Sequence, residues 1–382
     1  MEYFGTPFGD LPGLVNDPLV DEGDAYAARL AGEMAPGHFR TTVDGLIVSS
    51  IGLGTYLGEP DDAVDQRYQG AIERALAWGC NHLDTAVNYR FQRSERLLGR
   101  ALRAAIKRGD VRRDEVIVAT KGGFVPFEGR MPADPRRWVY EEYIEPGLAH
   151  ANEFAATYQH CLAPDFLDAM IERSCANLGL ETIDIYYLHN PETQRISNTQ
   201  ETFRRRMLDA FECLEEAVSA GAIMAYGTAT WTAYRSAPDA PDHVSLTQMM
   251  DLAYQVAGDD NHFRYVQMPY NLVMTEAFAL QNQQVGDEFL SPIEAAERLG
   301  LTVVISATLK QGLLASPFMA DLSTYFPGAE TDAQKAIQFV RSTPGVASAL
   351  VGMSQTAHVE ENLALRGLPP VDPDSIRRMF EP

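Results

Sequence analysis

Cysteine and basic residues are scarce in this sequence. It has four cysteines and none of them forms a Cys-x-x-Cys pair, so neither a zinc site nor a disulfide framework is indicated. Lysine and arginine together number 31 against 53 aspartates and glutamates, which gives a net charge of −22. Such an acidic chain argues against nucleic acid or an anionic membrane as a partner. Because the cysteines are not spaced to bind zinc, we also expect no metal site.

Long apolar runs are also missing. No stretch approaches the length that spans a membrane, and residues 1–30 show no charged-then-apolar secretion pattern. We therefore expect a cytoplasmic protein without membrane association, with its thiols buried and free: Cys80, Cys161, Cys175 and Cys213.

Short apolar stretches alternate with helical patterns eight times along the chain. Strands are expected at 50–53, 81–84, 116–120, 183–188, 223–228, 265–268, 302–306 and 348–351, and helices at 62–78, 94–107, 165–178, 202–220, 246–256, 292–299, 332–342 and 357–365. This alternation implies an α/β fold with a parallel sheet, and eight units favour a closed (β/α)8 TIM barrel. A doubly wound open sheet is the alternative, but no Gly-x-Gly-x-x-Gly turn follows the first strand.

The barrel is expected to carry two additions. Residues 1–37 form an N-terminal extension with a short helix near 24–34, and a hairpin turns at Asp44-Gly45. Residues 38–382 form a single barrel domain, with an insertion at about 123–164 expected over the C-terminal mouth. This insertion could be a specificity lid, an oligomer contact or a solvent-facing loop. Its aromatic residues could line a substrate pocket or form their own small core: Trp138, Tyr140, Tyr143 and Phe154.

Three neighbouring strand ends carry side chains suited to acid–base chemistry. Asp84 ends the second strand and Tyr89 follows five residues later. Lys121 ends the third strand and His189 ends the fourth. Each has an ordinary alternative, such as a helix cap, a solvent-facing lysine or a turn histidine. In a barrel, however, all strand-to-helix junctions lie on one face, so we expect the four side chains to converge there.

A phenol needs help to act as an acid near neutral pH, because its ordinary pKa is about 10. A buried lysine ammonium beside Tyr89 is expected to stabilise the phenolate and lower that pKa, with Asp84 holding the lysine. This arrangement suits proton delivery to a carbonyl oxygen as hydride arrives at carbon.

The motifs around these residues resemble the catalytic motifs of the aldo-keto reductase family. They read Asp84-Thr85-Ala86-x-x-Tyr89, Ala119-Thr120-Lys121-Gly122 and Tyr187-Leu188-His189-x-Pro191, and the likeness extends over residues 45–365. The resemblance implies a (β/α) barrel that binds NADPH, less often NADH, without a Rossmann motif. It also implies that Tyr89 is the proton donor, that Lys121 and Asp84 tune it, and that His189 orients the carbonyl.

The same resemblance assigns the remaining site residues. Substrate contacts are expected at Tyr56, Asn190 and Trp231, although Asn190 could equally begin the turn before Pro191. Cofactor contacts are expected at Gly54, Thr55, Asp84, Thr230, Gln267, Ser306, Leu309, Gly312, Gly352, Ser354, His358, Glu361 and Asn362.

The cofactor side departs from the family pattern. Ala229-Thr230 stands in place of a Ser-Asn pair that holds the nicotinamide amide, and Ser306 in place of a tyrosine that stacks on the nicotinamide ring. No Lys or Arg stands near Gly352 or Ser354, where a charge-assisted contact to the adenosine phosphate is common. We expect NADP(H) as cofactor, with NAD(H) as the alternative.

These features together predict an NAD(P)H-dependent carbonyl reductase or alcohol dehydrogenase acting on an aldehyde, ketone or sugar-like substrate, with Tyr89 as general acid/base. Two alternatives stay open. One is a Schiff-base lyase that uses Lys121 as nucleophile. The other is a catalytically weak, cofactor-binding regulatory or partner subunit, which the altered Ala229 and Ser306 positions would suit. The sequence names neither the substrate, the physiological direction nor the oligomeric state.

Overall fold

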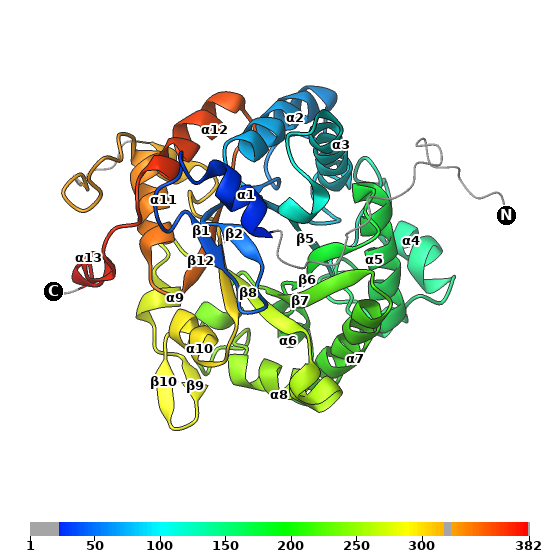
Figure 1. Cartoon of the computed structure of the whole chain (residues 1–382). Coiled ribbons are helices and arrows are strands. Elements are labelled where there is room, and N and C mark those ends of the chain that lie inside the picture. Colours follow the sequence, from blue (N-terminus) through cyan, green and yellow to red (C-terminus); the bar gives the residue numbers. More distant parts are fainter. Residues whose placement is uncertain (1–22, 317–321, 381–382) are drawn as a thin grey trace.

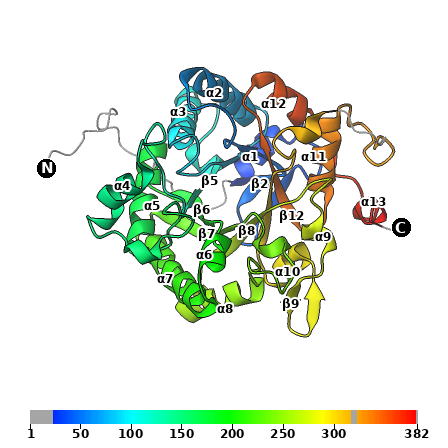
Figure 2. The same cartoon turned by 180° about the vertical axis from the view of Figure 1, so that it is seen from behind.

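A computed structural model describes residues 23–316 and 322–380 of the chain. Eight parallel strands close into a barrel in the order β11-β12-β3-β4-β5-β6-β7-β8, with helices around the outside (Figures 1 and 2). The predicted (β/α)8 barrel is confirmed, and the open sheet is excluded. The barrel strands are β3 (Ile51–Gly54), β4 (His82–Asp84), β5 (Ile117–Gly122), β6 (Ile183–His189), β7 (Ile223–Ala229), β8 (Phe263–Pro269), β11 (Thr302–Ser306) and β12 (Val346–Gly352).

The helices begin where polar side chains cap their first turns. Asp61 accepts from Val64 N, and both Ser291 and Thr331 form capping boxes with a residue three positions later. The principal helices are α2 (Asp62–Ala77), α3 (Arg93–Arg108), α5 (Pro164–Leu178), α7 (Gln200–Ser219), α8 (Leu246–Ala257), α10 (Pro292–Arg298), α11 (Asp332–Ser342) and α12 (Thr356–Leu363). Shorter elements are α1 (Gly23–Leu30), α4 (Pro135–Val139), α6 (Glu192–Ser197), α9 (Glu276–Ala279), α13 (Pro373–Arg378) and the hairpin of β9 (Gln283–Val285) with β10 (Glu288–Leu290).

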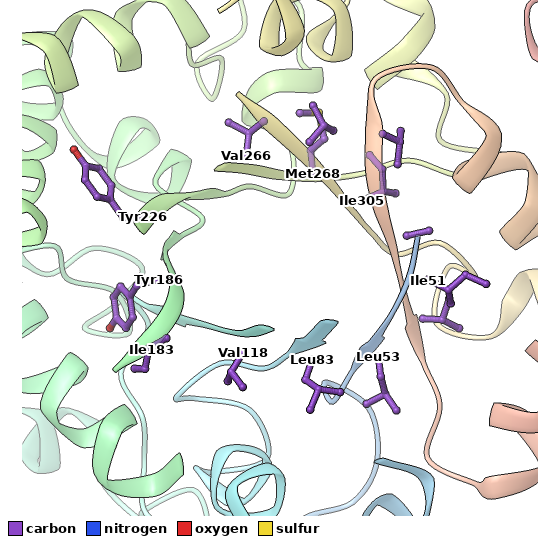
Figure 3. Close-up of a cluster of buried hydrophobic side chains, with 14 of the residues drawn as sticks. Ile51, Leu53, Leu83, Val118, Ile183, Tyr186, Tyr226, Val266, Met268 and Ile305 are labelled. Atoms are coloured by element: carbon purple, nitrogen blue, oxygen red, sulfur yellow. The ribbon is translucent and has the colours of Figure 1, made fainter. Parts of the chain in front are cut away.

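Side chains alternate between the two faces of the barrel strands. Val118, Tyr186 and Val266 point away from the barrel toward the helices (Figure 3). Their neighbours Ala119 and Tyr187 belong instead to a separate cluster inside the barrel. Because the side-chain period of a strand is two, this alternation directs Lys121, His189 and Gln267 inward at the ends of β5, β6 and β8.

The opposite end of the barrel is closed by the predicted hairpin. β1 (Phe39–Thr41) pairs with β2 (Ile47–Ser49), and Val48 packs in the cluster inside the barrel. Tyr265 donates its hydroxyl to Asp44 Oδ1 at 2.6 Å, which ties the turn of the hairpin to β8. The expected short N-terminal helix is α1, and residues 1–22 of the predicted extension lie outside the described residues. The carboxyl ends of the strands therefore form the open end.

The insertion after β5 packs mainly beside α5. Its helix α4 lies next to α5 in both cartoon views (Figures 1 and 2). Trp138, Tyr143 and Phe154 make edge contacts within a small hydrophobic cluster that includes Phe166 of α5, whereas Tyr140 is exposed. These aromatic side chains thus form the core of the insertion itself.

Candidate active site

A cavity of about 760 Å³ opens at the carboxyl ends of the strands. Every barrel strand contributes to it, either by its last residues or by the loop that follows. One lining residue from each junction, in chain order, is Gly54, Asp84, Phe124, His189, Ala229, Gln267, Ser306 and Gly352. The walls of the cavity are therefore built by segments spread over some 300 residues of chain, as expected of a barrel active site.

Nearly all the site residues expected from the sequence line this cavity. Asp84, Tyr89 and His189 lie at the strand ends, with Tyr56, Asn190 and Trp231 around them. The exception is Lys121, which is almost completely buried and does not line the cavity. The residues assigned to a cofactor all line it: Gly54, Thr55, Asp84, Thr230, Gln267, Ser306, Leu309, Gly312, Gly352, Ser354, His358, Glu361 and Asn362.

Lys121 and Asp84 form a buried ion pair, of which Asp84 lines the cavity. Lys121 Nζ donates to Asp84 Oδ1 at 2.5 Å and to the carbonyl oxygen of Thr85 at 2.8 Å. The second carboxylate oxygen of Asp84 accepts from Gln267 Nε2 at 2.8 Å. Burial lowers the pKa of Lys121, and the charge of Asp84 opposes that shift. Both oxygens of Asp84 are thus fixed by neighbours from two other strands.

Tyr89 lines the cavity next to this ion pair. Lys121 Nζ is 5.2 Å from the centroid of the Tyr89 ring, and the ring meets those of His189 and Tyr56 edge-on at centroid distances of 5.7 and 5.0 Å. Burial, followed by the charge of Asp84 and then Tyr56, raises the pKa of Tyr89 well above its ordinary value. The sequence-based expectation of a lowered pKa is therefore not met, because Asp84 offsets the lysine's charge and burial disfavours the phenolate. Tyr89 is held as a neutral phenol.

His189 is held as a neutral imidazole. Burial, reinforced by the charge of Lys121 and by His160, lowers the pKa of His189 well below its usual range. Its Nδ1 atom is buried without a hydrogen-bond partner. The ring also packs edge-on against Phe124 at a centroid distance of 4.9 Å. A neutral imidazole and a neutral phenol side by side can both hydrogen-bond to one carbonyl oxygen without adding charge to the site.

The cavity continues from Asp84, Tyr89 and His189 along the ends of β7, β8 and β11. Thr230 N donates to the carbonyl oxygen of Gln267 at 2.8 Å, which keeps the Thr230 side chain at the wall. Ala229 offers a methyl group there, and Ser306 a hydroxyl. Position 306 thus offers no aromatic ring for stacking on a ligand.

The far end of the cavity carries buried polar atoms that have no partner. Thr308 Oγ1 and Asn362 Oδ1 are both buried and unpaired, and both residues line the cavity. Unpaired buried polar atoms are costly, so these two atoms fit a polar ligand that is long enough to reach from Tyr89 to α12. Among the described lining residues none is lysine or arginine, while Glu361 adds a carboxylate. The described lining therefore offers a phosphate group backbone amides and uncharged polar side chains, and no lysine or arginine.

Some site residues escaped prediction from the sequence. Phe124 and Asn88 both line the cavity, and Asn88 Oδ1 is buried without a partner. Asn88 sits inside the motif that ends at Tyr89, so its place in the chain was a usable signal. Nothing in the sequence pointed to Glu192. Its carboxylate accepts from Trp231 N at 2.6 Å and from Thr232 N at 3.0 Å, and so fixes the loop after β7, about forty residues further along the chain.

The part of the chain that the structure describes contains no group of three or more His, Cys, Asp or Glu side chains arranged to hold a metal ion. Within the same residues, no helix combines the length and apolar character needed to cross a membrane.

Comparisons with known proteins agree on one family. The model of the Aldo/keto reductase family matches residues 50–322. Aldo-keto reductase family 1 member C13 of Mus musculus is 22% identical over 197 residues, which cover 49% of each chain. D-threo-aldose 1-dehydrogenase of a Pseudomonas species is 29% identical over 191 residues, or 48% of this chain and 50% of that protein. This chain thus spans about half the length of these curated relatives.

The fold has solved counterparts of low sequence identity. A crystal structure of an aldo/keto reductase from Klebsiella pneumoniae in complex with NADP and acetate superposes with a TM-score of 0.60. The match covers 90% of this chain and 94% of that one, at 18% identity.

Proposed function

The chain belongs to the aldo/keto reductase family, and from this premise we propose that it reduces an aldehyde or ketone, or oxidises the matching alcohol, with a nicotinamide cofactor. One observation carries the proposal. A neutral phenol, Tyr89, faces a cavity of about 760 Å³, and the buried Lys121–Asp84 ion pair lies next to it. Beside it stands the neutral imidazole of His189.

In this proposal Tyr89 is the general acid. Its raised pKa keeps the proton on the phenol at neutral pH, so the group is ready to donate when negative charge develops on the substrate oxygen. His189 orients the same oxygen with one hydrogen bond from its neutral ring. The Lys121 ammonium, 5.2 Å from the ring of Tyr89, stabilises the phenolate formed after proton transfer. In the oxidising direction, the phenolate takes the proton back from the alcohol.

We propose NADP(H) as the cofactor, with NAD(H) as the alternative. When bound, the cofactor supplies the hydride. The residues at hand fit such a molecule: Thr230 and Ser306 offer hydroxyl groups near Tyr89, and the unpaired Thr308 and Asn362 atoms offer polar contacts at the far end. The NADP in the Klebsiella pneumoniae structure supports this choice.

The substrate is proposed to be an uncharged, sugar-like carbonyl compound. The described cavity lining offers no lysine or arginine to pair with a substrate carboxylate or phosphate. It offers instead the amides of Asn88 and Asn190 and the half-exposed rings of Tyr56 and Trp231, groups that suit hydroxyls and flat apolar faces. The Pseudomonas relative, a D-threo-aldose 1-dehydrogenase, supports this class.

The experiment that tests the proposal is a two-step measurement. Quenching of protein fluorescence by NADPH and by NADH gives both dissociation constants. Single-turnover oxidation of the bound cofactor is then followed with a panel of aldoses and simple aldehydes. Cofactor oxidation with at least one neutral aldose or aldehyde is expected, and tight cofactor binding without any oxidation would contradict the proposal.

Two other functions were open from the sequence. A Schiff-base lyase needs an accessible lysine, but Lys121 is nearly fully buried and paired with Asp84, so that function is disfavoured. A cofactor-binding subunit with weak catalysis is favoured by the replacement of the nicotinamide-contacting residues by Ala229 and Ser306. The single-turnover step separates this second function from the proposed one.

We also propose that residues 38–382 act as one catalytic domain and that the insertion at 123–164 forms a wall of the site. Of the insertion's residues, Phe124 lines the cavity, and the hydrophobic cluster around Tyr143 fixes the rest against α5. The sequence left open a specificity lid, an oligomer contact or a solvent-facing loop for this insertion, and its aromatic side chains, which pack on one another, support the wall proposed here.

A further inference from the structure

A second buried histidine, His160, joins the insertion to the end of β6. It is completely buried, and its Nε2 atom lies 2.7 Å from the carbonyl oxygen of His189. Its Nδ1 atom lies 3.1 Å from Gln194 Nε2. A carbonyl oxygen accepts and an amide nitrogen donates, so His160 carries its proton on Nε2. Both ring nitrogens of His160 are therefore satisfied in one tautomer.

The orientation of the Gln194 amide is itself fixed. Its oxygen accepts from the Arg206 guanidinium of α7 and from Asn198 Nδ2 at 3.3 Å, which leaves its nitrogen for His160. Arg206 also donates to the carbonyl oxygen of Asn152 at 2.7 Å, so α7 is tied both to the insertion and to the glutamine that contacts the histidine. Burial lowers the pKa of His160 to about 4, and the ring stays neutral at physiological pH.

The carbonyl that His160 holds has no strand partner. β5 pairs with β6 only as far as Gly122 opposite Leu188, so on this side the His189 carbonyl lies beyond the ladder, while β7 still pairs with β6 at His189. The next residue, Asn190, has a left-handed backbone with φ of 48°, where the chain turns sharply away. Without a partner for this carbonyl, the end of β6 would be held by β7 alone, through the pairing of His189 with Ala229.

The approach of the insertion to this carbonyl is close. A side chain on Gly123 would place its first carbon 3.1 Å from His160 Nε2 and 3.2 Å from the His189 oxygen, and φ at Gly123 is +129°. Phe124, the next residue, packs edge-on against both imidazoles, at centroid distances of 5.0 Å from His160 and 4.9 Å from His189. The insertion therefore contacts both the backbone carbonyl of His189, through His160, and its imidazole ring, through Phe124.

We propose that His160 is a positioning residue for His189, through which the insertion fixes the imidazole at the angle needed to orient the substrate carbonyl. This inference rests on the proposed function. The side chain of His189 has no hydrogen bond at Nδ1, so its direction depends on its backbone and on the packing of Phe124 and Tyr89 against its ring.

Three variants of the full chain test the proposal. His160→Gln keeps an N–H donor near the position of the imidazole Nε2, and His160→Leu removes it. His150→Leu is the matched control, because His150 lies in the same insertion but is exposed. In His160→Leu we expect kcat for carbonyl reduction to fall about 10- to 100-fold, since small misplacements of a catalytic group cost about that much. Cofactor dissociation constants should stay within about twofold, and His160→Gln should keep kcat within about threefold of the wild type.

A second readout does not depend on turnover. In protein labelled with ¹⁵N-histidine, the ring nitrogens of His189, assigned with His189→Gln, report the tautomer and order of that ring. We expect these signals to shift or broaden in His160→Leu and to stay as in the wild type in His160→Gln and His150→Leu. If the wild type shows no turnover but the His189 signals still shift in His160→Leu, the proposed function is contradicted and the positioning role is supported. Unchanged His189 signals and unchanged kcat in His160→Leu would overturn the positioning role, as would equal losses of kcat in the Leu and Gln variants.

Discussion

Lys121 Nζ lies 2.5 Å from Asp84 Oδ1, and both side chains are buried at the ends of neighbouring strands. Removing one member of such a pair leaves an uncompensated charge, which costs about 3–5 kcal/mol. We expect Lys121→Met to lose both activity and several kcal/mol of unfolding free energy. Adding Asp84→Asn to it should restore most of the stability but none of the activity. Urea unfolding measures both effects, and a Lys121→Met variant as stable as the wild type would show that the pair is not formed.

The rate of carbonyl reduction should depend weakly on pH around neutrality. The pKa of Tyr89 is raised, so the phenol keeps its proton as pH rises until well above the ordinary tyrosine range. The pKa of His189 is lowered, so its ring stays neutral as pH falls through about 6.5, the ordinary histidine value. We expect kcat/KM for reduction to be flat between about pH 6 and 9. A clear inflection near pH 6.5 in the wild type would place a protonated His189 in the site.

The stability of the fold should fall in mild acid. Burial lowers the pKa of His38, His82 and His160 from 6.5 to about 4. Because the unfolded chain takes up these protons first, the stabilisation is present above pH 6.5 and is lost progressively as pH falls toward 4. Each histidine contributes about 1.4 kcal/mol per pH unit in that window.

Urea unfolding at several pH values measures this slope. In His82→Gln, the change of unfolding free energy with pH should be smaller by about 1.4 kcal/mol per pH unit, the contribution of one buried histidine. It should be unchanged in His150→Gln, because the side chain of His150 is exposed. An equal slope in the wild type and His82→Gln would show that His82 titrates normally in the folded protein.

Discrimination between NADPH and NADH should be weak. The described cavity lining has no lysine or arginine for the adenosine 2′-phosphate, and a hydrogen bond to a charged group contributes about 1.5–3 kcal/mol. We therefore expect the two dissociation constants to lie within about tenfold of each other. Ser354→Arg should tighten NADPH binding by about tenfold or more and leave NADH nearly unchanged, with Ser354→Gln as the uncharged control. Strong NADPH preference in the wild type would require a cation from elsewhere in the chain.

Most of the barrel could be predicted because strand and helix patterns repeat locally. The strands at β3, β4 and β11 fall within a residue or so of the expected ranges, since their apolar runs end at polar residues. The β9–β10 hairpin was missed because its strands are only three residues long, although Gly286-Asp287 is a turn signal. The six-residue helix α6 was missed for a similar reason, since it has no room for an apolar period.

The site was predictable only as far as its residues lie at strand ends. Asp84, Tyr89 and His189 line the cavity because the barrel brings all carboxyl ends together. The direction of the pKa shift of Tyr89 could not be predicted, because it depends on burial and on the distance to Asp84 in the folded chain. The same holds for His160, whose contact with the His189 carbonyl joins residues 29 positions apart.

The central claim is that Tyr89 donates the proton in carbonyl reduction, and Tyr89→Phe tests it most directly. Stopped-flow single-turnover oxidation of NADPH, with an aldose or aldehyde that the wild type reduces, should slow by about 10²- to 10⁴-fold in this variant, because general acid catalysis contributes that much. The NADPH dissociation constant should stay within about threefold of the wild-type value, since only a hydroxyl is removed. An oxidation rate equal to that of the wild type, with the cofactor bound, would contradict the account.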